Sequence, residues 1–223
     1  MIEIKGLTQS YRNKQVLKDV YLSIGNNEVC ALVGRNGAGK TTLIHSLLGL
    51  LPVKQGEITL SGFSNKQEGW KKHVAYLPEK FQLYPQLTGE ENFRFFASVD
   101  NPKVNEQRME ECLKMVNLWE HRLELIRGYS KGMLQRLGLG IMLYFDSPIM
   151  ILDEPTSGLD PMGRTEILAI LKSLRNKTIL FSSHHMDEIR QVCTHVAFLE
   201  NGEMKKYDTP EFIELLSLGG KTQ

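Results

Sequence analysis

The sequence has few of the features that mark secreted, disulfide-rich or membrane-spanning proteins. Its three cysteines are far apart, form no Cys-x-x-Cys pair and lie, in two cases, within apolar runs: Cys30, Cys112 and Cys193. We therefore expect small core residues in a reducing compartment. No apolar run approaches the ~18 residues that a membrane-spanning helix needs. Glu3 and Lys5 interrupt any apolar start, so we expect no signal peptide.

The sequence also lacks an excess of charge of one sign. It has 27 lysines and arginines against 26 aspartates and glutamates, which gives a net charge of +1. Proteins whose main partner is nucleic acid usually carry a broad basic surface, so we expect no nucleic-acid partner. A hydrophobic content of 41% argues against disorder, and 223 residues are enough for one full-sized core.

Short strand patterns alternate with helical patterns along the chain. Strand patterns occupy residues 2–4, 28–33, 57–60, 74–77, 149–152 and 178–183. Residues of about 84–144 have helical spacing instead, and Thr88 followed by Glu91 forms a capping-box pattern. This order predicts an α/β fold, with a mostly parallel sheet between flanking helices, an antiparallel β portion and a helical subdomain.

Residues 34–41 read Gly-Arg-Asn-Gly-Ala-Gly-Lys-Thr and lie between a strand pattern and a helical pattern. The glycines let the backbone turn its N–H groups inward, toward an anion at the N-terminus of the next helix. Lys40 suits the β- and γ-phosphates of a nucleotide, and the Thr41 hydroxyl suits Mg²⁺. A glycine-rich turn that fits the pattern by chance is the alternative. The context favours a P-loop NTPase core, with nucleotide contacts from Gly34, Arg35, Asn36, Gly37, Ala38, Gly39, Lys40, Thr41 and Thr42.

Two carboxylates, Asp153 and Glu154, directly follow the apolar strand pattern at 149–152. In open α/β sheets, ligands bind at the carboxyl ends of the strands. Beside a phosphate loop, Asp153 would hold Mg²⁺ through its water shell. Glu154 would take a proton from the water that attacks the γ-phosphate. The alternative is a solvated acidic pair that merely ends a strand.

Further segments resemble the ATP-binding-cassette (ABC) family. Residues 129–133, Tyr-Ser-Lys-Gly-Met, are similar to the family's signature Leu-Ser-Gly-Gly-Gln and lie just before the strand with the two carboxylates. Residues 157–160, Ser-Gly-Leu-Asp, resemble its D-loop, and His184 after Ser183 resembles its switch histidine. Tyr11 lies where the family stacks an aromatic ring on adenine. The resemblance covers essentially all 223 residues in the family's order.

The resemblance implies an ATPase that works as a head-to-tail dimer, formed with a second copy of this chain or a homologous cassette. Each ATP, with its Mg²⁺, would lie between the phosphate loop of one cassette and the signature of the other. Ser130 and Gly132, at a helix start, would contact the γ-phosphate in trans, and Asp160 of the D-loop would join them. His184 would bridge Glu154, the attacking water and the γ-phosphate.

Two departures from the family pattern involve candidate site residues. The signature has Lys131 and Met133 where Gly and Gln are usual. Lys131 opposes the helix dipole by roughly a few tenths of a kcal/mol but would favour a nearby phosphate, and a merely solvated side chain is the alternative. Glu79 stands where the family usually has its Q-loop glutamine. It can still reach a hydrated Mg²⁺ or the attacking water, so we include it among the catalytic and metal-binding candidates, with an uninvolved side chain as the alternative.

The resemblance also divides the chain into parts. Residues 1–223 would form a single ABC ATP-binding domain, with an ATP-binding core at about 1–80 and 145–210 and a helical subdomain at about 84–144 that carries the signature. A C-terminal helix would occupy about 210–223. Asn201-Gly202 reads as a hairpin turn, and Thr209 with Pro210 suits the start of the closing helix.

Residues 84–88, Tyr-Pro-Gln-Leu-Thr, resemble short cassettes of bacterial exporters whose membrane domains are separate chains. The implied partner is a transmembrane permease, and the implied location is cytoplasmic, peripheral on the cytoplasmic face of the cell membrane. The surface that contacts the permease would include aromatic and apolar side chains, with burial of about half of them in the core as the alternative: Phe81, Leu83, Tyr84, Phe93, Phe95 and Phe96. Three alternatives remain: an importer subunit, a soluble ABC ATPase without a transport partner, and a cassette that binds ATP only as a structural clamp.

Overall fold

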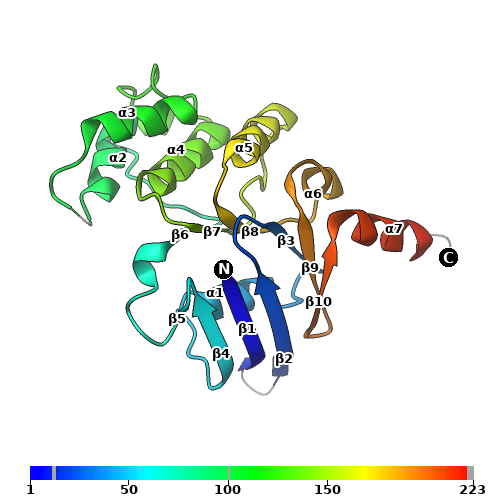
Figure 1. Cartoon of the computed structure of the whole chain (residues 1–223). Coiled ribbons are helices and arrows are strands. Elements are labelled where there is room, and N and C mark those ends of the chain that lie inside the picture. Colours follow the sequence, from blue (N-terminus) through cyan, green and yellow to red (C-terminus); the bar gives the residue numbers. More distant parts are fainter. Residues whose placement is uncertain (12–13, 100, 220–223) are drawn as a thin grey trace.

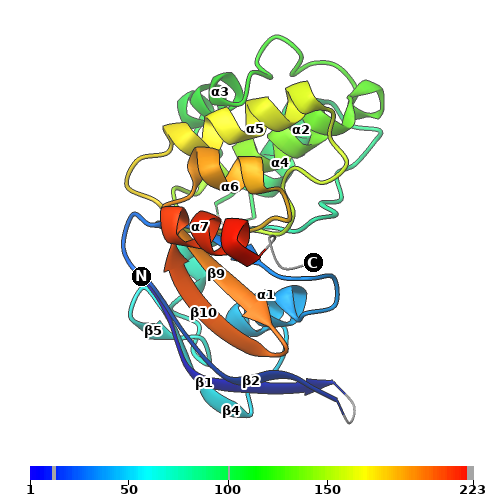
Figure 2. The same ribbon diagram turned by 90° about the vertical axis from the view of Figure 1, so that its right-hand side faces the viewer.

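The computed structural model describes residues 1–11, 14–99 and 101–219 and contains two sheets with helices around them (Figure 1). Figure 1 shows α2, α3 and α4 as one layer at the top, and β1, β2 and β4 at the bottom of the molecule. Figure 2 shows α6 and α7 on the side of β9 and β10. Among the described residues, no helix has the length and apolar composition of a bilayer-spanning segment.

The smaller sheet is antiparallel, with strand order β2-β1-β4-β5. Its strands are β1 (Ile2–Tyr11), β2 (Lys14–Ile24), β4 (Gln55–Leu60) and β5 (Phe63–Ser64). One face of this sheet packs against the apolar side of α1 (Lys40–Leu47). Gly56 marks a close crossing of two strands, because a Cβ there would lie 2.6 Å from the carbonyl oxygen of Gly6.

The larger sheet has the order β10-β9-β3-β8-β7-β6 and is parallel except for its β9–β10 hairpin. Its strands are β3 (Val29–Val33), β6 (Val74–Leu77), β7 (Ile149–Leu152), β8 (Thr178–Ser182), β9 (His195–Glu200) and β10 (Glu203–Asp208). Every residue of β7 and β8 is buried, as expected for strands covered on both faces. The segments that leave the carboxyl ends of β3, β6, β7 and β8 therefore emerge along one edge.

α1 and the smaller sheet cover one face of the larger sheet, and helices from the rest of the chain cover the other. These helices are α2 (Gly89–Ala97), α3 (Glu106–Met115), α4 (Lys131–Tyr144), α5 (Pro161–Ser173), α6 (Met186–Val192) and α7 (Thr209–Gly219), with short 3₁₀ turns at Lys71–His73 and Ile126–Gly128. The apolar sides of α2, α3 and α4 share one core cluster with β6, β7 and α5. The signature lies at the start of α4, so this packing fixes its position relative to the sheet.

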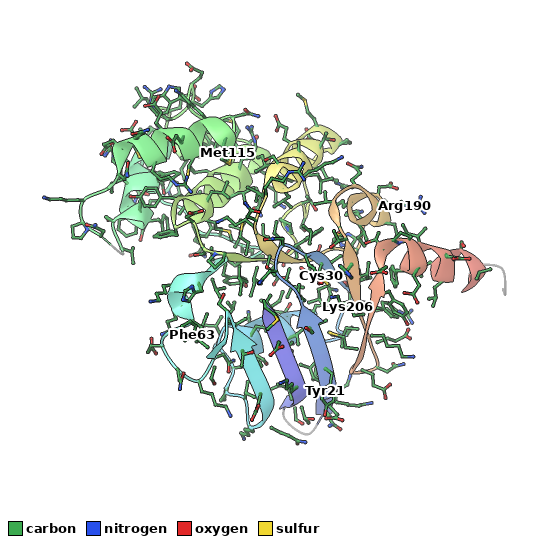
Figure 3. The ribbon with its side chains drawn as sticks, in the orientation of Figure 1. Tyr21, Cys30, Phe63, Met115, Arg190 and Lys206 are labelled. Carbon is green, nitrogen blue, oxygen red and sulfur yellow. The ribbon has the colours of Figure 1, made fainter. Side chains whose placement is uncertain are left out.

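The cysteines are free thiols within this packing. Cys30 lies near the centre of the molecule (Figure 3), and its burial raises the pKa of its thiol to about 12. Burial also raises the pKa of Cys112 to about 11. Both thiols are therefore protonated at neutral pH, and they serve as small core residues.

The mostly parallel sheet with flanking helices is confirmed, and local signals located several elements correctly. Thr88 and Glu91 form the predicted capping box at the start of α2, with hydrogen bonds of 3.2 and 2.8 Å. Asn201 and Gly202 connect β9 to β10 with φ values of 52° and 84°, which is the geometry of a tight hairpin turn. The closing helix begins at Thr209 itself.

Other elements were missed or only partly predicted from the sequence. β2 was missed because its alternation is broken: Asp19 has a φ of 48°, and the buried positions step from Leu17 to Val20. α6 was missed because it is only 7 residues long. The helical stretch at 84–144 is three helices with loops between them.

Candidate functional site

The carboxyl edge of the larger sheet surrounds a cavity of about 520 Å³. Segments from four strand ends contribute to it, although they lie far apart in the sequence. The lining residues are Val16, Asn36, Gly37, Gly39, Lys40, Thr41, Thr42, Glu79, Asp153, Glu154, Ser157 and His184. The structure thus brings together the predicted phosphate loop, both carboxylates, the Q-loop position and the switch histidine.

The phosphate loop is formed by local backbone geometry. Gly39 has a φ of 112° and caps α1, and Gly37 has a φ of 78°, both in the region that favours glycine. Gly34 is required by packing, because a Cβ there would lie 2.5 Å from the carbonyl oxygen of Leu199. Lys40 is buried, and its Nζ donates to the carbonyl oxygen of Gly34 at 2.9 Å. The ammonium group is therefore held over the loop that would receive an anion.

A second cavity, of about 640 Å³, adjoins the first between β2 and the β9–β10 hairpin. Arg35, Asn36 and Ala38 of the phosphate loop face it, together with Val16. Nothing in the sequence pattern pointed to Val16 or to the hairpin as part of the site. The backbone of Tyr11 ends β1, but its side chain lies outside the described residues, so its contact with adenine stays a prediction.

Asp153 and Glu154 are held by a buried hydroxyl at the end of the neighbouring strand. Ser182 Oγ donates to Asp153 Oδ1 at 2.7 Å and accepts from the backbone N–H of Glu154, also at 2.7 Å. Glu154 has a φ of 48°, which is unusual for a residue with a long side chain. Such a conformation persists only where the surroundings enforce it. Ser182 was missed in the sequence, because a serine that ends an apolar strand carries no motif.

Replacing Ser182 with alanine should lower the free energy of unfolding by roughly 1–3 kcal/mol, because a buried carboxylate oxygen and a backbone N–H would each lose their partner. Urea denaturation of the purified variant measures this. Ser23→Ala is a matched control, since Ser23 is an exposed serine in β2. Equal stability of the two variants would mean that Ser182 does not support the two acids.

His184 directly contacts the second carboxylate. Its Nδ1 lies 3.1 Å from Glu154 Oε2, while its side chain remains 55% exposed and that of Glu154 only 17%. The ring of His185 lies against it, with centroids 4.0 Å apart. An exposed imidazole beside a sheltered carboxylate can form hydrogen bonds to a ligand and to water in the same cavity.

The oxygen donors at this edge fit one Mg²⁺ ion that also binds phosphate. Thr41, Asp153 and Glu79 line the same cavity, and Mg²⁺ prefers a few protein oxygens completed by water and phosphate oxygens. Within the described residues, no cluster of three or more His, Cys, Asp or Glu side chains could hold a metal by itself.

The hydroxyl group of Tyr76 lies near the carboxylate of Asp153. Burial, and after it the charge of Asp153, raises the pKa of Tyr76 to about 12, so its hydroxyl stays neutral.

The signature and the D-loop form a separate cavity of about 440 Å³. Ser130 caps α4 by accepting from Met133 N at 3.2 Å, and Asp160 caps α5 by accepting from Gly163 N at 2.8 Å. Lys131 extends over the D-loop, since a Cβ on Gly158 would lie 2.3 Å from its Nζ. The residues that line this cavity are Ser130, Lys131, Gly132, Met133, Arg136, Gly158, Leu159, Asp160, Met162, Gly163 and Glu166.

The two cavities share no lining residue. Within one chain, the structure therefore does not bring the signature residues or Asp160 to the phosphate loop. The phosphate-loop cavity lacks donors from a second helix start, and the signature cavity lacks a phosphate loop. Each cavity therefore holds one half of the ATP site that the family resemblance predicted.

An apolar groove of about 480 Å³ lies between β6 and the helical layer. Phe81, Phe96 and Val99 line it, and Val99 is 76% exposed. Phe81 and Phe96 pack at 5.1 Å between ring centroids, and Tyr84 and Phe95 at 4.8 Å. Phe93, predicted to lie on this surface, is fully buried and belongs to the core, because it faces inward from α2.

The sequence matches the family described as ABC transporter over residues 17–157. The uncharacterized ABC transporter ATP-binding protein YdbJ of Bacillus subtilis is 35% identical over 210 residues, which are 92% of this chain and 68% of the relative. The linearmycin resistance ATP-binding protein LnrL of the same organism is 33% identical over 229 residues, covering 100% of this chain and 73% of the relative. The bacitracin transport ATP-binding protein BcrA of Bacillus licheniformis is 34% identical, covering 92% and 68%.

Among solved structures, a similar fold occurs in a dimeric ATP-binding cassette in a post-hydrolysis state, bound to ADP and phosphate. It superimposes with a TM-score of 0.82, covers 94% of this chain and 99% of its own, and is 25% identical. The cassette architecture therefore extends over nearly the whole chain.

Proposed function

The chain belongs to the ABC transporter family and is one of its ATP-binding ATPases, and we propose that it drives transport across the cytoplasmic membrane by ATP-dependent closure of a cassette dimer. One observation carries the proposal. The phosphate loop and the signature line two cavities that share no residue, so one chain presents two incomplete half-sites. Two chains packed head to tail would complete both.

In the proposed site, the terminal phosphates of ATP lie on the phosphate loop and against Lys40. Glu154 takes a proton from the attacking water. His184 keeps that water and the γ-phosphate in line, supported by its 3.1 Å contact with Glu154. A positioned base contributes about 10²–10⁴-fold in rate, and orientation of the attacking water contributes further.

Mg²⁺, when bound, would neutralise charge on the β- and γ-phosphates, and Thr41, Asp153 and Glu79 would hold it directly or through water. Ser182 keeps Asp153 turned toward this position through its 2.7 Å hydrogen bond. Glu79 adds a negative charge where the family usually has a neutral glutamine.

The second chain supplies the other half of each site. The Ser130 hydroxyl already accepts from Met133 N, which leaves its own hydrogen for the γ-phosphate of the partner's ATP. The first N–H groups of α4, including that of Gly132, have no helical partner and point the same way. Lys131 adds a positive charge at this helix start. A cassette of similar fold forms a dimer with ADP and phosphate bound, which supports the pairing of two chains.

We infer export as the direction and a transmembrane permease as the partner, which places the protein on the cytoplasmic face of the membrane. Support comes from relatives named for linearmycin resistance and bacitracin transport. The apolar groove beside β6 is the surface on which a short segment of the permease would dock, because its rings leave apolar area exposed. Co-purification with a detergent-solubilised permease tests the transport role against a soluble ABC ATPase.

Replacing Val99 with aspartate should reduce recovery of the permease about tenfold or more, because an unpaired charge in an apolar contact costs well over the ~1.4 kcal/mol of a tenfold change. Hydrolysis by the isolated protein should not change, since Val99 lies outside the cavity with the phosphate loop. Met115→Asp is the matched control. Met115 is 43% exposed, ends α3 and does not line the groove. Equal recovery with both variants would place the permease elsewhere.

A further inference from the structure

Glu188, in α6, is a buried carboxylate for which the proposed mechanism has no use. Only 1% of its surface is exposed. Removing a carboxylate from water is costly unless hydrogen bonds and opposite charge replace its hydration. The partners of Glu188 therefore indicate which parts of the molecule it holds.

Those partners come from three different segments. Glu188 Oε2 accepts from Thr156 Oγ1 at 3.0 Å and from Ser183 Oγ at 2.7 Å. Its Oε1 lies 3.4 Å from Nε of Arg164, on α5, as an ion pair. These two atoms lack an aligned hydrogen bond among the described side chains, so this third contact is the weakest. The two hydroxyl groups are therefore the firm contacts.

Both hydroxyl groups belong to loops that carry functional residues. Thr156 lies between Glu154 and the D-loop Asp160. Ser183 directly precedes His184, and its Oγ also accepts from the backbone N–H of His185 at 3.1 Å. The Ser183 hydroxyl thus connects Glu188 to the backbone that follows the switch histidine.

Ser182 and Ser183 act on opposite sides of this loop. Successive side chains at the end of a strand point in opposite directions. Ser182 accordingly bonds to the segment of Asp153 and Glu154, while Ser183 bonds to Glu188. The hydrogen bonds of these two serines together hold the loop that carries His184 in a fixed position relative to Asp153 and Glu154.

We propose that Glu188 is a positioning residue for ATP hydrolysis, which fixes the switch-histidine loop to the segment between Glu154 and the D-loop. It sets the 3.1 Å contact of His184 with Glu154 without touching the nucleotide. Because Thr156 leads to Asp160, the same carboxylate connects the phosphate-loop cavity to the signature cavity of one chain. This inference rests on the proposed catalytic roles of Glu154 and His184.

Replacing Glu188 with alanine should lower kcat about 10²-fold, the cost of a misplacement of about 1 Å, while the KM for ATP stays within about twofold. Glu188→Gln should restore most of kcat, because its amide oxygen can still accept from Thr156 and Ser183. Asp187→Asn is the control, since Asp187 is an exposed carboxylate in the same turn of α6. A merely structural role would not separate kcat from KM in this way.

A double-mutant cycle tests the path through Ser183. Ser183→Ala should lower kcat on its own but cost less in the Glu188→Ala background, because the two variants share the hydrogen bond from Ser183 Oγ to Glu188 Oε2. Additive losses would overturn the inference, and so would parental kcat in folded Glu188→Ala. If Glu188→Ala does not fold, Thr156→Val and Ser183→Ala each remove one contact and must both lower kcat. Parental hydrolysis by His184→Ala and Glu154→Gln would instead refute the proposed catalytic roles.

Discussion

Replacing Glu154 with glutamine is expected to leave ATP binding intact, to reduce hydrolysis about 10²–10⁴-fold and to trap a dimer. Glutamine has nearly the same shape, and its amide can still hydrogen-bond with His184, which lies 3.1 Å from the native carboxylate. It cannot take a proton from water. ATP would therefore stay in the closed interface, and phosphate release, nucleotide titration and light scattering would measure the three effects.

Glu120→Gln is the control for this experiment, because Glu120 is exposed and lies outside the cavity with the phosphate loop. Hydrolysis by Glu154→Gln at the parental rate would show that another group is the base. Glu79 would then be the first candidate, as it is the other carboxylate besides Asp153 that lines the cavity. Loss of ATP binding would instead mean that Glu154 supports the phosphate loop.

Replacing Ser130 with arginine should lower turnover of the dimer by about 10²-fold or more while nucleotide binding by the monomer is unchanged. The long side chain would occupy the place of the partner's γ-phosphate and remove a hydroxyl donor from it, and one lost donor to developing charge costs about 10²–10³-fold. The same change removes the cap of α4, which costs about 1 kcal/mol. Thr88→Ala removes the equivalent cap of α2 and controls for that loss.

A mixture of two inactive variants separates trans from cis action. A dimer of one Lys40→Ala chain and one Ser130→Arg chain has one site with both defects and one site with neither. Mixing should therefore restore hydrolysis that neither variant has alone. If the mixture stays inactive and Ser130→Arg weakens ATP binding by the monomer, the signature acts within its own chain, and the head-to-tail dimer is refuted.

Residues that act through their neighbours in sequence could be predicted from the sequence. The phosphate loop depends on glycines at positive φ, followed at once by Lys40 and a helix start, and all of these lie within residues 34–41. Ser130 and Asp160 likewise cap helices that begin at the next residue. The capping box of Thr88 has the same local character. Such contacts need only a few adjacent backbone angles, which the side chains involved favour directly.

Residues that act across the fold could not be predicted in this way. Ser182 and Glu188 carry no motif, and their contacts join residues up to 32 positions apart. Phe93 and Phe95 have the same chemistry and differ by two positions, yet one is fully buried and the other is 46% exposed. The direction in which each faces depends on how α2 packs against the sheet.

The sequence by itself indicated the chemistry of the protein. The phosphate loop and the two acids follow from residue types and close neighbours, and the histidine and the signature from their resemblance to the ABC family. Only the tertiary structure decided which of these groups meet. The parallel pairing of β7 with β8 brings Ser182 to Asp153 and His184 to Glu154. The packing of α4 and α5 gives the signature and D-loop a cavity apart from the phosphate loop, since contacts between distant segments depend on strand register and helix packing.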